Sequence, residues 1–227
     1  MAEEYAYGHW SIAVTMIVVS LFFIFRFLPM RTAMQRRSGG ALVAFIIALF
    51  TEMYGFPLTI YLLSSWFGIP IGFDHVSGHL LGDLITHLGL GNGWVIVMLA
   101  SNLLIVAGIW MISSGWDRVY AAGEGLVTDG IYARVRHPQY TGIFVITLGF
   151  LIQWPTLVTV FLWPFVIWMY AGLARREERN VLLKHPEEYR KYMQRTPMFI
   201  PRLGAVRSGR TPATRHPTPG RGGHRES

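Results

Sequence analysis

The chain has 227 residues, 52% of them apolar, with a formal net charge of +7 and no cysteine. The lack of cysteine excludes a disulfide scaffold and a cysteine-ligated metal centre, and the length fits one domain. The basic residues flank long apolar segments and do not alternate with aromatic residues on a polar domain. This pattern indicates contact with an anionic membrane surface and argues against nucleic acid as a partner.

Three apolar segments lie in the N-terminal half, over 11–28, 41–63 and 94–112. Each is close to the ~20 residues that a helix needs to cross the hydrocarbon of a bilayer. The first follows an acidic N-terminus and precedes no small-residue cleavage site. It is therefore interpreted as a retained helix and not as a signal peptide. The second contains Glu52 and Pro57, which interrupt its apolar pattern.

Two shorter apolar segments, 143–153 and 156–173, are separated only by Trp154 and Pro155. A reversal at this point predicts a hairpin of two helices, the second kinked at Pro164. The predicted fold class is therefore all-α. We expect an integral membrane protein with about five transmembrane helices, the last two forming a hairpin, followed by a cytoplasmic C-terminal helix and a disordered tail.

The basic residues predict the orientation of these helices. With the N-terminus outside, the outer segments 1–10, 64–93 and 153–155 contain none of the 20 Lys and Arg residues. All of them lie inside or, for Arg26, within one turn of the inner face. This distribution follows the positive-inside rule and predicts a multi-pass protein of the bacterial inner membrane, with its C-terminus in the cytoplasm.

Two polar clusters lie at the ends of the predicted hairpin. Residues 136–142 read Arg-His-Pro-Gln-Tyr-Thr-Gly and precede its first helix, and residues 175–178 read Arg-Arg-Glu-Glu and follow the apolar part of its second. The hairpin brings the two clusters to the same membrane face. Charged groups beside lipid are costly, so a cluster of this kind is a candidate functional site.

The residue types at this predicted site favour a ligand that carries both signs of charge. Pro138 suits the first turn of a helix, which places Arg136 and His137 at a helix N-terminus that favours an anionic group. Glu177 and Glu178 offer the opposite charge. S-adenosylmethionine, with a carboxylate, an ammonium and a sulfonium, is such a ligand. Alternatively, these are interfacial residues that anchor the hairpin through salt bridges.

Five motifs follow one another between residues 115 and 202, at 125–132, 136–142, 177–178, 186–192 and 200–201. In order and spacing they resemble the isoprenylcysteine carboxyl methyltransferase family, whose core the phospholipid N-methyltransferases share. The resemblance implies an integral membrane enzyme that methylates a lipophilic or lipid-modified acceptor with S-adenosylmethionine. It implies a cofactor pocket formed by Arg136, His137, Pro138, Tyr140, Glu177 and Glu178.

The resemblance also suggests further site residues and a division of the chain. Gly123 and Gly125 are similar to the Gly-x-Gly of the phospholipid enzymes, or else belong to a flexible loop. The expected regions are a three-helix membrane region (1–112), a methyltransferase-like catalytic region (113–203) and a disordered basic tail (204–227).

The sequence departs from the family where the acceptor would react. Prenylcysteine enzymes typically place an arginine one turn before the Glu pair, where this chain has Leu173. Arg134 or Arg175 is then the candidate for orienting a carboxylate acceptor. An amine acceptor would instead need a base, His137 or a Glu. In either case we expect direct methyl transfer that depends on positioning and on exclusion of water.

Two other classes of function stay open at this point. A membrane reductase of the sterol type, using NADPH, has a related His-Pro-x-Tyr segment, although the adjacent Glu177 and Glu178 argue against it. A non-catalytic, metal-responsive membrane protein is suggested by four residues that recur every fourth position and could bind a divalent ion on one helix face: His75, His79, Asp83 and His87. Nearby glycines weaken such a helix.

Some side chains within the spans allow more than one interpretation. An acid buried in a membrane is usually functional, but Glu52 is equally suited to a structural hydrogen bond with Asn102 or Tyr54. Three tryptophans near span ends are interpreted as interface anchors, namely Trp116, Trp154 and Trp163.

Overall fold

The computed structural model describes residues 8–28, 30–69, 78–122 and 125–202, and every regular element in these ranges is helical. In chain order the elements are α1 (Trp10–Phe27), α2 (Ala33–Phe50), the π-helical turn η1 (Thr51–Gly55), α3 (Leu58–Phe67), α4 (Leu80–His87), α5 (Gly93–Ala122), the 3₁₀ turn η3 (Gly130–Ala133), α6 (Pro138–Gln153), α7 (Leu157–Lys184) and α8 (Pro186–Arg195). The predicted all-α fold is confirmed.

Four segments are long and apolar enough to cross a membrane: α1, α2 together with η1, α5 and α7. The chain is thus a multi-pass membrane protein. The fifth long element, α6, has 16 residues and packs between α5 and α7. The predicted hairpin therefore corresponds to α6 and α7. The boundary expected after residue 112, between the three-helix membrane region and the catalytic region, falls inside α5.

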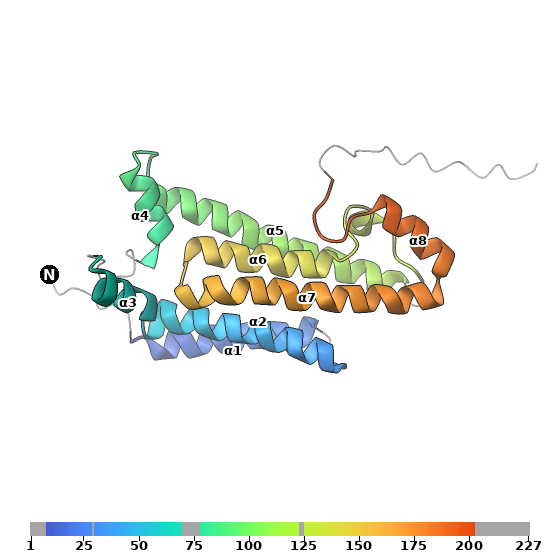
Figure 1. Cartoon of the computed structure of the whole chain (residues 1–227), viewed down its shortest axis with the longest axis horizontal. Coiled ribbons are helices and arrows are strands. Elements are labelled where there is room, and N and C mark those ends of the chain that lie inside the picture. The colour runs from blue at the N-terminus through green and yellow to red at the C-terminus, as the bar shows by residue number, and fades with distance from the viewer. Residues whose placement is uncertain (1–7, 29, 70–77, 123–124, 203–227) are drawn as a thin grey trace, which may run out of the picture.

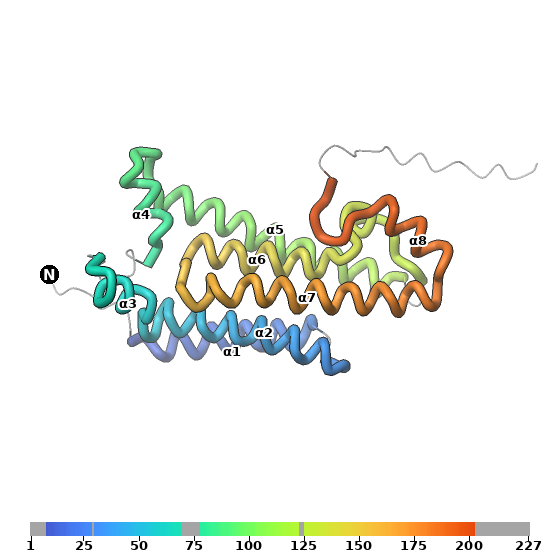
Figure 2. Tube along the Cα trace, in the orientation of Figure 1, coloured from blue at the N-terminus to red at the C-terminus, as the bar shows by residue number. Residues whose placement is uncertain are grey.

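The long helices run side by side and alternate in direction (Figure 1 and Figure 2). α5 packs on α6 and α6 on α7, while α2 packs on α7 and carries α1. α3 and α4 lie at the end of the bundle where the chain begins, and η3 and α8 lie at the opposite end. The mouth of the hairpin therefore faces α8, and the reversal between α6 and α7 lies at the far end.

The second predicted span has different limits from those expected. Its helix begins at Ala33, where Thr32 and Gln35 form a capping box, and it ends at Gly55 instead of continuing to residue 63. The reason is Pro57, because the residue before a proline avoids the α region and Phe56 is extended, at φ −123° and ψ 116°.

Glu52 stabilises this break from within η1. Its side chain is 5% exposed, and its Oε2 accepts a hydrogen bond from the Thr59 N–H at 2.9 Å, which satisfies a free donor in the first turn of α3. The Thr59 hydroxyl oxygen in turn accepts from the N–H of Leu157 at the start of α7. Asn102 donates to Met98 O on its own helix and is not the partner of Glu52. Glu52 therefore links η1 to α3, and Thr59 links α3 to the far end of the hairpin.

The reversal between α6 and α7 is closed by capping and aromatic contacts. Thr156 and Thr159 form a capping box at the start of α7. Trp154 is 3% exposed and packs edge-on against His79, whose Nδ1 lies 2.8 Å from Gln153 O. Trp154 is thus a buried packing residue in this structure, and His79 joins α4 to the tip of the hairpin.

α5 and α6 approach so closely that their backbones are in contact. A Cβ added at Gly108 would lie 2.6 Å from Gly142 O, and a Cβ added at Gly142 would lie 2.6 Å from Gly108 O. Ser101 and Gly115 lie seven residues before and after Gly108 and are also buried. Small residues allow membrane helices to pack at this separation. The crossing fixes the start of α6, where the candidate site begins.

Candidate active site

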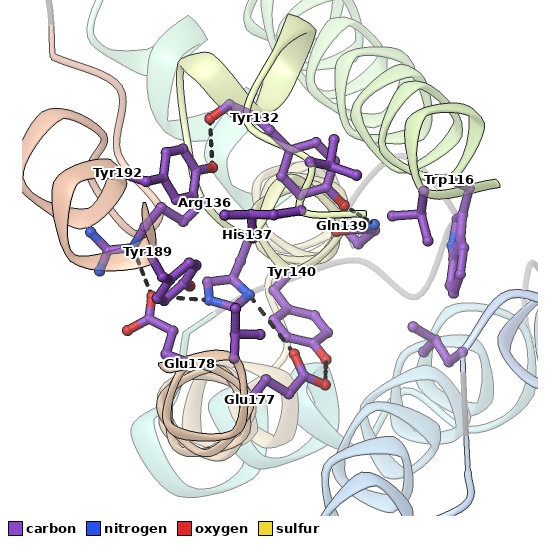
Figure 3. A pocket seen from close by; sticks show the side chains of 15 residues that line it. Trp116, Tyr132, Arg136, His137, Gln139, Tyr140, Glu177, Glu178, Tyr189 and Tyr192 are labelled. Carbon is purple, nitrogen blue, oxygen red and sulfur yellow. Dashed lines mark hydrogen bonds and ion pairs between the residues drawn. The ribbon is translucent and has the colours of Figure 1, made fainter. Parts of the chain in front are cut away.

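A cavity of about 270 Å³ opens at the mouth of the hairpin (Figure 3). Its walls come from the last turns of α5, the segment that includes η3 and the start of α6, the end of α7, and α8. These elements are distant in sequence, and the α6–α7 hairpin brings them together. The cavity is the meeting point of the two polar clusters noted in the sequence.

A buried ion pair lies at the centre of one wall. Glu178 Oε1 accepts hydrogen bonds from Arg136 Nε at 2.7 Å and from His137 Nε2 at 3.2 Å. The Arg136 and Glu178 side chains are 10% and 6% exposed. Arg136 also donates through Nη1 to two carbonyl oxygens at the C-terminal end of α8, Met193 O and Thr196 O. A buried charge is tolerated when it is paired and hydrogen-bonded in this way.

Glu177 has different surroundings from its neighbour. Its side chain is 34% exposed, and its Oε1 accepts a hydrogen bond from the Tyr140 hydroxyl at 2.7 Å. His137 Nδ1 lies 3.9 Å from Glu177 Oε2, and the rings of His137 and Tyr140 are stacked with centroids 5.6 Å apart. Glu178 therefore holds Arg136 and His137 in place, whereas Glu177 presents a carboxylate to the cavity.

The start of α6 is fastened by the segment after α8. His137 is the N-cap residue and Pro138 occupies the first turn, as predicted. The N–H groups of Arg136 and His137 donate to Pro197 O and Met198 O. The polar motif is thus held by main-chain bonds as well as by its side chains.

Three tyrosines from the motifs at 125–132 and 186–192, which were not assigned to the site from the sequence, also line the cavity: Tyr132, Tyr189 and Tyr192. The Tyr192 hydroxyl donates to Tyr132 O at 2.7 Å, and Gln139 donates to the Tyr132 hydroxyl. Burial raises the pKa of Tyr132 to about 12 and also raises the pKa values of Tyr189 and Tyr192. All three therefore stay protonated at neutral pH. The available signal was the i, i+3 spacing of Tyr189 and Tyr192, which puts both on one helix face.

Comparison with known proteins identifies the region that carries most of this cavity. The model of the isoprenylcysteine carboxyl methyltransferase family matches residues 94–184, which run from α5 to the end of α7. Through this region the chain is similar to that family. The family resemblance inferred from the motifs is confirmed.

Individual relatives match different shares of the chain. The nickel-cobalt-cadmium resistance protein NccN of Alcaligenes xylosoxydans xylosoxydans is 34% identical over 60% of this chain and 65% of its own length. The protein-S-isoprenylcysteine O-methyltransferase of Schizosaccharomyces pombe is 36% identical over 34% of this chain and 33% of its own. The methanethiol S-methyltransferase of Crocosphaera subtropica is 29% identical over 63% of this chain and 57% of its own length. The chain thus spans less than two thirds of each of these relatives.

Most residues that the family resemblance assigns to the cofactor do gather at the cavity. Arg136, His137, Tyr140, Glu177 and Glu178 all line it, with Pro138 beneath them at the start of α6. Gly125 is not among the lining residues, and Gly123 lies outside the described residues.

The two arginines proposed to orient an acceptor are not brought to this cavity. Arg134 lines a second, separate cavity with Arg118, whose guanidinium is paired with Asp129 at 2.6 Å. Arg175 is exposed on α7. Because a helix turns about 100° per residue, Arg175 projects some 200° away from Glu177. The family assignment therefore leaves the group that would orient the acceptor unidentified.

The stripe of possible metal ligands does not form a site among the described residues. His79 is buried at the hairpin tip, Asp83 and His87 are exposed, and His75 lies outside the described ranges. Across the parts of the chain that the structure covers, no three His, Asp or Glu side chains are grouped so that they could hold a metal ion.

Proposed function

We propose that this chain is an S-adenosylmethionine-dependent methyltransferase that transfers a methyl group directly to a lipophilic acceptor held in the membrane. The observation that carries the proposal is the meeting of His137 and Tyr140 with Glu177 and Glu178 in one cavity. The match of the methyltransferase family model to residues 94–184 supports it, as do two relatives whose names describe transfer to an isoprenylcysteine protein and to methanethiol.

The cavity residues fit this cofactor in charge and polarity. When bound, S-adenosylmethionine supplies an electrophilic methyl group on a cationic sulfur. Glu177, the carboxylate that faces the cavity, would attract a cationic group. Tyr132, Tyr189 and Tyr192 also line the cavity and offer aromatic surface and hydroxyl groups. Leu126, Val127 and Val181 add apolar lining that excludes water, which strengthens every charge interaction in the site.

The chain's own contribution to the reaction would be positioning. Arg136 and Glu178 fix the start of α6 against the end of α7, so that the His137 ring and the Glu177 carboxylate keep their relative places. Holding the reactants in near-attack geometry can lower a barrier by about 7–11 kcal/mol. Since Arg134 and Arg175 do not line the cavity, we propose no contact between them and the acceptor.

Transfer of a labelled methyl group tests this proposal. Purified protein in detergent should move isotope from S-adenosylmethionine into an organic-extractable product when native membrane lipids are supplied. His137→Ala should reduce incorporation at least about 100-fold, because the variant loses both the contact with Glu178 and the stacking on Tyr140. His87→Ala, at the far end of the bundle, is the matched control and should leave incorporation unchanged. Equal incorporation by the His137 variant would contradict the proposal.

We further propose that the cavity faces the cytoplasm. All Lys and Arg residues of the described ranges belong to the α8 end of the bundle, and the end formed by α3 and α4 has none, which is the distribution favoured on the cytoplasmic side. A topology reporter fused after Arg202 is expected to report the cytoplasm, and one fused after Ile69 the opposite side. An external signal from the Arg202 fusion would overturn this orientation.

A further inference from the structure

Trp116 on α5 places an unpaired hydrogen-bond donor at the cavity. It is one of the lining residues, and its indole Nε1 is buried with no hydrogen-bond partner among the described residues. An indole nitrogen can only donate. Buried polar groups are nearly always paired, and one left unpaired costs about 1–3 kcal/mol. A donor kept in this state at a cavity indicates a partner that arrives with a ligand.

The position of Trp116 points to the acceptor and not to the cofactor. Figure 3 shows Trp116 on the side of the cavity away from Arg136, Tyr189 and Glu178. Its lining neighbours, Val119 on α5 and Leu28 just after α1, are apolar. One face of the indole is stacked on Tyr120, with centroids 5.5 Å apart. This side of the cavity suits the apolar chain of a lipid-like molecule.

The polar groups that line the described cavity already have partners. Glu177 accepts from Tyr140, and Glu178 accepts from Arg136 and His137. Gln139 donates to Tyr132. Arg136, the cation in the lining, spends its Nε and Nη1 donors on Glu178 and two carbonyl oxygens. Among the described residues, Trp116 Nε1–H is the buried side-chain nitrogen of this lining that has no hydrogen-bond partner.

We propose that Trp116 is a positioning residue whose indole N–H binds the reacting oxygen or sulfur of the acceptor. This inference rests on the proposed function. The chemistry it selects is a carboxylate or thiolate on an apolar chain, because these groups keep further lone pairs for an N–H donor, whereas the single lone pair of a neutral amine is used to form the new bond. As the methyl group moves, the acceptor's electron pair forms the new bond to carbon. The pair of the broken carbon–sulfur bond stays on the donor's sulfur. No proton moves in this step, because a carboxylate is already ionised and a thiol has lost its proton to solvent before it reacts.

Three acceptors that differ only in their reacting group test this assignment. Decanethiol, decanoate and decylamine are offered to wild-type protein, to Trp116→Phe and to Trp110→Phe, with S-adenosylmethionine affinity measured alongside. Phenylalanine keeps an aromatic ring and removes the N–H. Trp110 lies on the same helix, lines the second cavity and serves as the matched control.

We expect wild-type protein to methylate decanethiol or decanoate in preference to decylamine. Trp116→Phe should lose about tenfold or more in kcat/KM for that substrate, through its KM, with unchanged affinity for the methyl donor. The preferred substrate identifies sulfur or oxygen as the acceptor atom. Trp110→Phe should match wild type.

Other results would overturn the role of Trp116. These are a preference for decylamine, a loss of donor affinity in Trp116→Phe, or equal rates for wild type and Trp116→Phe. If none of the three probes is methylated, the same comparison with native lipid extract decides, and equal rates there would also reject it. A wild-type protein that binds no S-adenosylmethionine would instead be a failure of the proposed function itself.

Discussion

Alanine in place of Glu178 is expected to raise the Kd for S-adenosylmethionine by about 100-fold or more. Glu178 is the shared partner of Arg136 and His137, and its removal leaves the Arg136 guanidinium buried without a counter-charge. Breaking a buried pair in this way typically costs about 3–5 kcal/mol of folding stability. The His137 ring and the Glu177 carboxylate then no longer keep their relative places. Calorimetric titration of the variant against wild-type protein measures the effect.

Two further variants separate loss of the site from loss of the fold. Glu178→Gln keeps an oxygen that can accept from Arg136 and should show a smaller fall in affinity. Glu188→Ala removes a side chain that is 75% exposed on α8 and should bind as wild type does. Because Arg136 also donates to Met193 O and Thr196 O, the Glu178→Ala protein should still unfold cooperatively. Unchanged donor affinity in Glu178→Ala would show that the Glu pair is not part of the cofactor site.

Leucine in place of Gly108 is expected to have the largest effect on stability. A Cβ at this position already meets Gly142 O at 2.6 Å and Ile146 side-chain and backbone atoms within 3.1 Å, so α5 and α6 would be forced apart. We expect a loss of about 3 kcal/mol or more, which is the upper range for overpacking. The thermal midpoint in detergent measures it, and labelled methyl transfer should be lost with it, because α6 begins at the candidate site.

A matched substitution distinguishes this crossing from a general intolerance of leucine. Gly40 lies in α2, and a Cβ added there has no atom within 4 Å. Gly40→Leu should therefore leave the thermal midpoint within a few degrees of wild type. If Gly108→Leu were as stable as Gly40→Leu, the close contact between α5 and α6 would be wrong.

The hairpin and the polar part of the cavity were predictable because local signals determine them. A proline in the first turn places the start of α6, and a two-residue interval between apolar segments places its reversal. Two antiparallel helices of known length then bring His137 close to Glu177 and Glu178 with no further information. The basic residues could be assigned to one end of the bundle for the same reason.

Helix limits and side-chain directions were not predictable from hydropathy. α5 continues ten residues beyond the expected end at 112, since a helix need not stop where it leaves the bilayer and residues such as Asp117 are stable in a solvated turn. The second span stops at Gly55 because Pro57 starts a new helix. Arg175 looked suitable by its sequence distance from Glu177, but helical rotation turns it away.

The unpaired donor of Trp116 was invisible in the sequence for a different reason. A tryptophan near the end of a membrane span is typical of an interface anchor, and that interpretation also covered Trp154 and Trp163. The structure places Trp154 in the core and pairs Trp163 Nε1 with Thr147. Whether an indole N–H has a partner depends on neighbours from distant parts of the chain, and only the assembled bundle provides them.

The most direct test of the methyltransferase account is a calorimetric titration of the purified, detergent-solubilised protein with S-adenosylmethionine and, separately, with NADPH. The account predicts saturable binding of the methyl donor that disappears in His137→Ala and persists in His87→Ala, with no binding of NADPH. Binding of NADPH without binding of S-adenosylmethionine would contradict it and place the cavity among the membrane reductases.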